Sequence, residues 1–116
     1  MTEADIQSKI RVALSPHGIV FRTNSGEFWQ GKQVYSKEFK QNVLVDLRRV
    51  QGLPKGFSDL LYLGFDGQPA FIEIKKPKKT QTPEQIRFME LMRSYGYRAG
   101  VARSVEDAMK IIQEVK

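Results

Sequence analysis

Two apolar segments joined by a turn limit most narrowly how this chain can fold. The segments are SDLLYLGF (58–65) and AFIEIKK (70–76), and DGQ lies between them. This pattern predicts an antiparallel hairpin. Pro77 ends the second strand, because proline cannot donate a hydrogen bond to a neighbouring strand. Within that apolar strand Glu73 and Lys75 are two residues apart, so both side chains point to the same face.

Helices and further strands are expected around this hairpin. Three helices are predicted, over residues 2–15, from Thr82 and from Ser104, because each of these starts has a capping residue. Strands are predicted at 19–24 and 97–102. The order is helix, strand, basic insertion, strand, strand, helix, strand, helix. It predicts an α/β fold with a central mixed sheet and helices packed on it.

The insertion spans residues 27–52 and carries most of the bases of the region between the first two predicted strands. VYSKEF and NVLVDL within it fit either short strands or helical turns. Trp29 and Tyr35 lie among the bases. A segment of this length without obvious structure is usually functional.

Composition excludes several classes of protein. A chain of 116 residues fits one domain, 1–116. Without cysteine there is no disulfide, zinc–thiolate site or thiol nucleophile, and with His17 alone no serine–histidine–aspartate triad is evident. No phosphate-binding glycine loop indicates a nucleotide cofactor. No membrane span or signal peptide is evident, so a cytoplasmic protein is expected. The net charge of +6 favours a polyanionic partner.

Carboxylates near the hairpin point to a metal site. Asp59 begins the first strand and Glu73 lies on the second. Paired carboxylates suit Mg²⁺ or Mn²⁺, and the backbone carbonyl of Ile74 is a candidate further ligand. Lys75 is placed to hold a water nucleophile or to balance charge on a phosphoryl oxygen. The pattern therefore indicates phosphodiester hydrolysis.

Each of these residues also has a simpler interpretation. Glu73 and Lys75 fit a solvated strand face, where an exposed ion pair contributes little. Asp59 fits a turn before a strand. Glu3 is a candidate third carboxylate, but it also suits a helix N-terminus. Gln85 is a candidate for orienting the water or Lys75, but it also fits a capping box.

The length of the hairpin loop decides whether the two carboxylates meet. A two-residue loop, Asp66-Gly67, would turn Asp59 to the face opposite Glu73. A three-residue loop, such as Asp66-Gly67-Gln68, would instead pair Asp59 with Lys75, because a shift of one residue inverts every side chain. The metal-site hypothesis therefore predicts an odd loop or a bulge.

The segments GFSD, FIEIKKP and TPEQ, in this order, resemble the PD-(D/E)XK nuclease superfamily, and most closely its virus-type replication-repair nuclease (VRR-NUC) family. The resemblance runs from Glu3 to the GVARS segment, and the insertion is its least family-like part. It implies a restriction-endonuclease-like core of order αβββαβ, with an additional C-terminal helix here. Ser58 stands where the superfamily has proline before the aspartate.

The resemblance also implies roles for individual residues. Asp59 and Glu73 would be the metal ligands and Lys75 the catalytic lysine. Gln85 would be the catalytic glutamine of the following helix, and Glu3 the acid of the N-terminal helix, in or beside the metal site. It further implies Mg²⁺- or Mn²⁺-dependent endonuclease cleavage of DNA. The enzyme would be a homodimer from a phage or bacterium that acts in DNA repair, with Holliday-junction resolution as the leading activity.

Basic residues are the expected DNA contacts, because lysine and arginine bind phosphates without reading sequence. They are Lys76, Lys78 and Lys79 after the site, and Lys32, Arg48, Arg49 and Lys55 before it. Trp29 and Tyr35 fit either stacking on unpaired bases or a dimer interface, and the interface is favoured for at least one.

Two other functions stay open. One is a nuclease that cuts flaps, nicked DNA or RNA. The other is a DNA-binding module without catalysis, although the intact set of Asp59, Glu73 and Lys75 argues against it.

Overall fold

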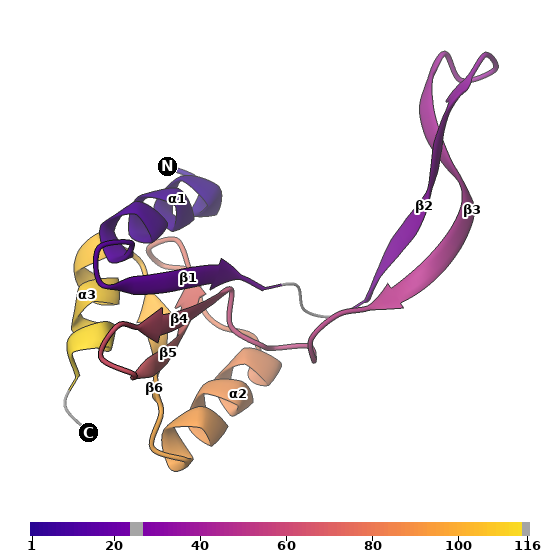
Figure 1. Cartoon of the computed structure of the whole chain (residues 1–116). Coiled ribbons are helices and arrows are strands. Elements are labelled where there is room, and N and C mark those ends of the chain that lie inside the picture. The colour runs from indigo at the N-terminus through magenta and orange to yellow at the C-terminus, as the bar shows by residue number, and fades with distance from the viewer. Residues whose placement is uncertain (24–26, 115–116) are drawn as a thin grey trace.

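A four-stranded mixed sheet forms the core of the protein in the computed structural model, which describes residues 1–23 and 27–114 (Figure 1). The strand order is β1-β4-β5-β6, and only the pair β5–β6 is parallel. The strands are β1 (Gly18–Arg22), β4 (Leu60–Gly64), β5 (Pro69–Ile74) and β6 (Arg98–Ala102). The helices are α1 (Glu3–Leu14), α2 (Pro83–Ser94) and α3 (Val105–Gln113). The predicted mixed α/β fold is confirmed.

The helices begin where their capping residues predict. Thr2 and Asp5 form a complete capping box at α1, and Thr82 and Gln85 form one at α2. At α3 the Ser104 side chain accepts a hydrogen bond from the backbone of Asp107. These contacts satisfy backbone N–H groups that have no partner inside the helix. No helix among the described residues is long and apolar enough to cross a bilayer.

The main apolar core lies between one face of the sheet and helices α1 and α3. Alternate residues of β5 point into it, so that Ala70, Ile72 and Ile74 are almost fully buried. Helix α1 contributes the side chains that its spacing predicts. The full buried cluster is Ile6, Ile10, Leu14, Leu60, Tyr62, Ala70, Ile72, Ile74, Ala102, Ala108 and Ile112.

An aromatic cluster joins α2 to the opposite face of the sheet. Phe71 of β5 contacts the rings of Phe57, Phe88 and Tyr97, with centroids 5.9, 5.6 and 5.6 Å away. Edge-on and tilted ring contacts of this kind add to the free energy gained by burial. Because Glu73 shares the face of Phe71, its carboxyl lies on the α2 side of the sheet and not in the main core.

The insertion is a long two-stranded hairpin, here called the arm, made of β2 (Glu27–Ser36) and β3 (Gln41–Gln51). Of the two segments that the sequence left undecided, NVLVDL lies wholly within β3, whereas VYSKEF contains the end of β2 and part of the turn that follows it. The arm extends away from the core (Figure 1), which gives the molecule an elongated shape of 57 × 31 × 26 Å.

The loop between β4 and β5 has three residues, Phe65-Asp66-Gly67. The ladder pairs Leu63 with Pro69, and the backbone N–H of Gly64 donates to the carbonyl of Gln68 at 3.0 Å. The predicted odd loop is therefore present, but it begins one residue earlier than the example proposed from the sequence. The physical reason is Gly67, whose φ of +82° closes the third position of such a loop.

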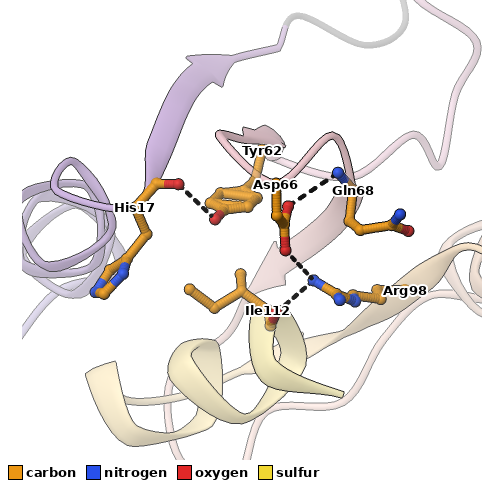
Figure 2. A network of polar contacts seen from close by, with 6 residues as sticks. All are labelled: His17, Tyr62, Asp66, Gln68, Arg98 and Ile112. Carbon is orange, nitrogen blue, oxygen red and sulfur yellow. Dashed lines mark hydrogen bonds and ion pairs between the residues drawn. The ribbon is translucent and has the colours of Figure 1, made fainter. Parts of the chain in front are cut away.

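A polar network holds this loop in place (Figure 2). The side chain of Asp66 accepts a hydrogen bond from the Gln68 backbone at 2.9 Å, and its other oxygen lies 3.9 Å from the guanidinium of Arg98. Arg98 also donates to the carbonyl of Ile112 at the end of α3, and the Tyr62 hydroxyl donates to the carbonyl of His17. The network ties the loop to β6, and at the same end of the sheet ties the start of β1 to β4.

We expect Gly67→Ala to lower the free energy of unfolding by about 1–2 kcal/mol, because a left-handed conformation is costly for a residue with a Cβ. A Cβ at this position meets no atom within 4 Å, so the effect is one of backbone strain alone. Thermal unfolding measures it, as a fall in Tm of roughly 5 °C. Gly67→Asn is the matched control, because asparagine tolerates this conformation better. Equal losses in both variants would contradict this explanation.

Candidate active site

The predicted site residues gather at one end of the sheet. Strand β4 begins there and the antiparallel β5 ends there, because the two strands run in opposite directions. Helices α1 and α2 also begin at this end, and the arm departs from it (Figure 1). The polar network of Figure 2 lies at the other end. Motifs far apart in the sequence therefore meet in one place.

Asp59 is fixed by backbone hydrogen bonds. The ladder ends at Leu60–Ile72, and one more step of the same register sets Asp59 opposite Glu73. The Asp59 carboxylate accepts a hydrogen bond from the backbone N–H of Ile74 at 2.9 Å. Its own carbonyl accepts one from the N–H of Thr23 at 3.0 Å. The carboxylate is therefore held against the strand that carries Glu73.

Glu73 is a buried carboxyl group, with 2% of its surface exposed. Burial, a hydrogen-bonded contact with Asp59 and repulsion from the Asp59 charge raise its pKa to about 9, while nearby Lys75 acts in the opposite direction. One carboxyl oxygen, Oε2, is buried without a hydrogen-bond partner among the described residues. Such an oxygen is costly for the fold unless another group satisfies it.

The two carboxyl groups fit a divalent cation. A bound Mg²⁺ or Mn²⁺ would satisfy the buried oxygen of Glu73 and offset the repulsion from Asp59, and both ions prefer oxygen ligands. Within residues 1–23 and 27–114, no group of three or more His, Cys, Asp or Glu residues lies close enough to hold a metal. Backbone carbonyls, such as that of Ile74, and water would have to complete the coordination, as is usual for Mg²⁺.

Lys75 and Glu3 lie near this carboxylate pair. Lys75 is partly buried, and its backbone N–H donates to the carbonyl of Ala102 at 3.2 Å, which holds it beside β6. Glu3 is exposed in the first turn of α1, and its charge contributes slightly to the raised pKa of Glu73. The role of Glu3 as a ligand stays a prediction.

The side chain of Gln85 takes part in the capping box of α2, which is the simpler of its two predicted roles. Its side-chain oxygen accepts a hydrogen bond from the backbone N–H of Thr82 at 2.9 Å. The backbone N–H of Gln85 donates a hydrogen bond to the Thr82 hydroxyl at 3.2 Å. The capping box therefore occupies the carbonyl oxygen of the Gln85 side chain. A catalytic role would fall to the amide nitrogen and stays a prediction.

Predicted DNA-contact residues lie in three places. Lys76, Lys78 and Lys79 follow the site in the connection to α2, where Arg103 donates a hydrogen bond of 2.5 Å to the carbonyl of Lys79. Lys55 lies between the arm and β4, and its charge acts on Glu84 of α2. Lys32, Arg48 and Arg49 are exposed on the arm. The bases thus extend from the carboxylate pair onto the arm.

Sequence reasoning missed the supporting role of Thr23, and it singled out Ser58 only as a departure from the superfamily pattern. The Thr23 hydroxyl donates to the carbonyl of Ser58, and the buried Ser58 hydroxyl donates to the carbonyl of Leu60 at 3.0 Å. Together these bonds fix the entry into β4 just before Asp59. The partner of a single threonine at a strand end has no local signature, because it depends on the pairing of β1 with β4.

Comparisons with known proteins agree with the fold. The model of the VRR-NUC domain family matches residues 1–106. A solved structure described as a VRR_NUC domain is similar to this chain with a TM-score of 0.58 at 20% sequence identity. The similarity covers 98% of this chain and 97% of that one. No curated protein matches the chain.

We expect Glu73→Gln to raise the stability of the metal-free protein, because a neutral amide removes the cost of a buried carboxyl group beside Asp59. At pH 8 in EDTA, thermal unfolding should show a gain on the order of 1–2 kcal/mol, which is roughly 5 °C in Tm. The exposed Glu90→Gln is the matched control and should change Tm little. A Glu73→Gln protein that melts below the wild type would contradict this account of the site.

Proposed function

Since the chain belongs to the VRR-NUC nuclease family, we propose that it is a metal-dependent endonuclease that hydrolyses DNA phosphodiester bonds at Asp59, Glu73 and Lys75. The proposed substrate is branched DNA, with the Holliday junction foremost, and the proposed active form is a homodimer. The observation that carries the proposal is the buried oxygen of Glu73, which has no hydrogen-bond partner within residues 1–23 and 27–114 and lies near Asp59 and Lys75.

Each residue has a distinct task in this proposal. Asp59 and Glu73 hold the cation, and the N–H of Ile74 keeps the Asp59 carboxylate in place. When bound, Mg²⁺ or Mn²⁺ supplies Lewis-acid activation of the phosphate and of the attacking water. Lys75 holds the water by a hydrogen bond and balances the negative charge that develops on the phosphoryl oxygens. Gln85 positions the water or Lys75 through its amide nitrogen.

The neighbouring bases support a DNA substrate. Lys76, Lys78 and Lys79 follow Lys75 closely in the chain and would contact phosphates beside the scissile bond, where such contacts position DNA without reading its sequence. Substrate choice then depends on shape. Two sites related by a two-fold axis fit a junction, which has nearly two-fold symmetry itself.

A DNA-binding module without catalysis is the weaker alternative. Binding alone would give no advantage to a buried carboxyl group with an unsatisfied oxygen, because such a group lowers stability. A nuclease for flaps, nicked DNA or RNA uses the same chemistry and differs only in the substrate. Substrate comparison therefore separates these functions.

We expect wild-type protein to cut a labelled four-way junction by paired symmetric nicks in Mg²⁺ or Mn²⁺, and not in EDTA. Flap, nicked, duplex and single-stranded DNA and a matched RNA are tested beside it. Lys75→Ala should lose roughly 10²-fold or more in rate, as expected for loss of a charge-stabilising group. Lys110→Ala, on α3, removes the same charge from another part of the fold and should cut normally. Tight binding without cutting would favour the binding module, and cutting of flaps alone would remove the junction as substrate.

Gln85→Glu separates the capping role of this side chain from its proposed catalytic role. Glutamate completes a capping box as well as glutamine does, so Tm should stay within about 2 °C of the wild type. The rate of cleavage should fall, because the variant loses the amide donor and adds negative charge near the carboxylate pair. Wild-type rates in this variant would assign Gln85 to capping only.

A further inference from the structure

One face of the arm is apolar, exposed and uncovered. Four large side chains lie on it, with the exposed fractions 61% for Trp29, 64% for Tyr35, 50% for Leu44 and 53% for Leu47. We call these four residues the arm apolar face. A two-stranded ribbon is only marginally stable in water by itself, and contiguous exposed apolar surface usually marks an interaction site.

A bulge in β3 brings Leu47 onto this face. The register shifts between Gln30 and Lys32, so that Asp46 is the extra residue and has a φ of +53°. Without the shift, strand alternation would place Leu47 on the face opposite Leu44. With it, Leu47 lies across Gly31, where a Cβ would come within 2.8 Å of Leu47 Cδ2. The bulge thus gathers leucines on one side of the ribbon.

Protein suits this face better than DNA. Aliphatic leucine side chains do not stack on unpaired bases as aromatic rings do, and much of the affinity for DNA comes from cations. Strand pairing puts Lys32 and Arg48 on the other face of the ribbon, and Arg49 is the arm base that lies beside Trp29. The face with Lys32 and Arg48 also carries Val34, Val43 and Val45, which are only partly exposed. The large, well-exposed apolar side chains therefore lie on the face with one base, and DNA fits the face with two bases better.

The core carries a second uncovered apolar surface. Helix α2 packs on β6, at one edge of its face of the sheet, and β1 lies at the other edge. There Ile19 is 51% exposed, Phe21 47% and Leu63 43%. We call these three residues the bare sheet face. Ile19 pairs with Leu63 across the strands, so these residues form one patch.

We propose that the arm apolar face of each chain docks on the bare sheet face of a second copy, in a reciprocal exchange of arms. The arm cannot cover this patch on its own chain, because it extends away from its own core (Figure 1). A two-fold arrangement satisfies both surfaces on both copies at once. The inference rests on the homodimer of the proposed function and specifies how that dimer is held.

The available area supports an exchange and not a one-sided contact. A ribbon of ten residues is roughly 33 Å long and roughly 10 Å wide, so one face covers roughly 300 Å². A single arm and its receiving surface would bury at most roughly 600 Å², which is less than stable interfaces need. Two arms and two receiving surfaces would bury up to roughly 1,200 Å², so only the exchange can reach the lower limit of standard stable interfaces.

Sedimentation and light scattering at about 10 µM test the proposal without any nuclease assay. The arm variant is Leu44→Ser with Leu47→Ser, and the sheet variant is Ile19→Ser with Leu63→Ser. The control is Val43→Thr with Val45→Thr, on the other side of the ribbon. We expect dimeric wild type and control, and monomeric arm and sheet variants whose dissociation constants rise at least 100-fold. Circular dichroism and Tm establish that each variant is folded.

Mixing the two monomeric variants gives the sharpest result. A mixed pair keeps one intact contact, between the arm of the sheet variant and the sheet of the arm variant, so its two chains should associate more tightly than either variant does with itself and less tightly than the wild type does. A sheet variant that stays dimeric would overturn docking of arm on sheet.

A monomeric wild type would overturn the dimer inference, and a loss of DNA binding in its arm variant would assign the apolar face to DNA. A monomeric wild type that still cuts DNA would reject the arm exchange and keep the proposed nuclease activity. A dimeric wild type that loses its dimer in both variants but cuts no DNA would keep the arm exchange and reject the nuclease activity.

Discussion

The register of one hairpin determines whether the two carboxyl groups of the candidate site lie on the same face of the sheet. With three residues in the loop between β4 and β5, Asp59 comes to lie opposite Glu73, on the face away from the main core. A loop shorter by one residue would turn the two carboxyl groups to opposite sides of the sheet. The contacts of Asp66 and the left-handed Gly67 that set this register lie at the far end of both strands. The contacts that stabilise the hairpin loop at one end of the sheet therefore determine how the two carboxyl groups lie at the other end.

The site itself works against the fold. Glu73 is buried, its pKa is raised to about 9, and one of its oxygens has no partner among the described residues. A chain selected only for stability would place an apolar or amide side chain there. Conflict between a local rule and the overall fold is typical of functional sites, and here it coincides with the carboxylate pair that the sequence motif singled out.

The elements with strong local signals could be predicted from the sequence. Capping residues such as Thr82 mark helix starts, and the spacing of Ile6, Ile10 and Leu14 specifies a buried helix face. Whether the hairpin loop has an even or an odd number of residues could not be predicted from the sequence, because the same residues fit a two-residue and a three-residue loop. The odd loop could be stated only as a requirement of the metal-site hypothesis. The arm strands were ambiguous, since their alternation is broken by a bulge at Asp46. The contacts of Thr23 depend on distant pairing and have no local signal.

Among the described residues the arm has few contacts with the core, and it departs from the end of the sheet that carries the carboxylate pair (Figure 1). It packs mainly on itself, whereas the core is a network of helices and strands. Such an attachment separates two kinds of evolutionary change. The arm can change in length, in charge or in binding partner without altering the strands that hold Asp59 and Glu73. The candidate site can in this way be preserved while the appendage that accompanies it is exchanged.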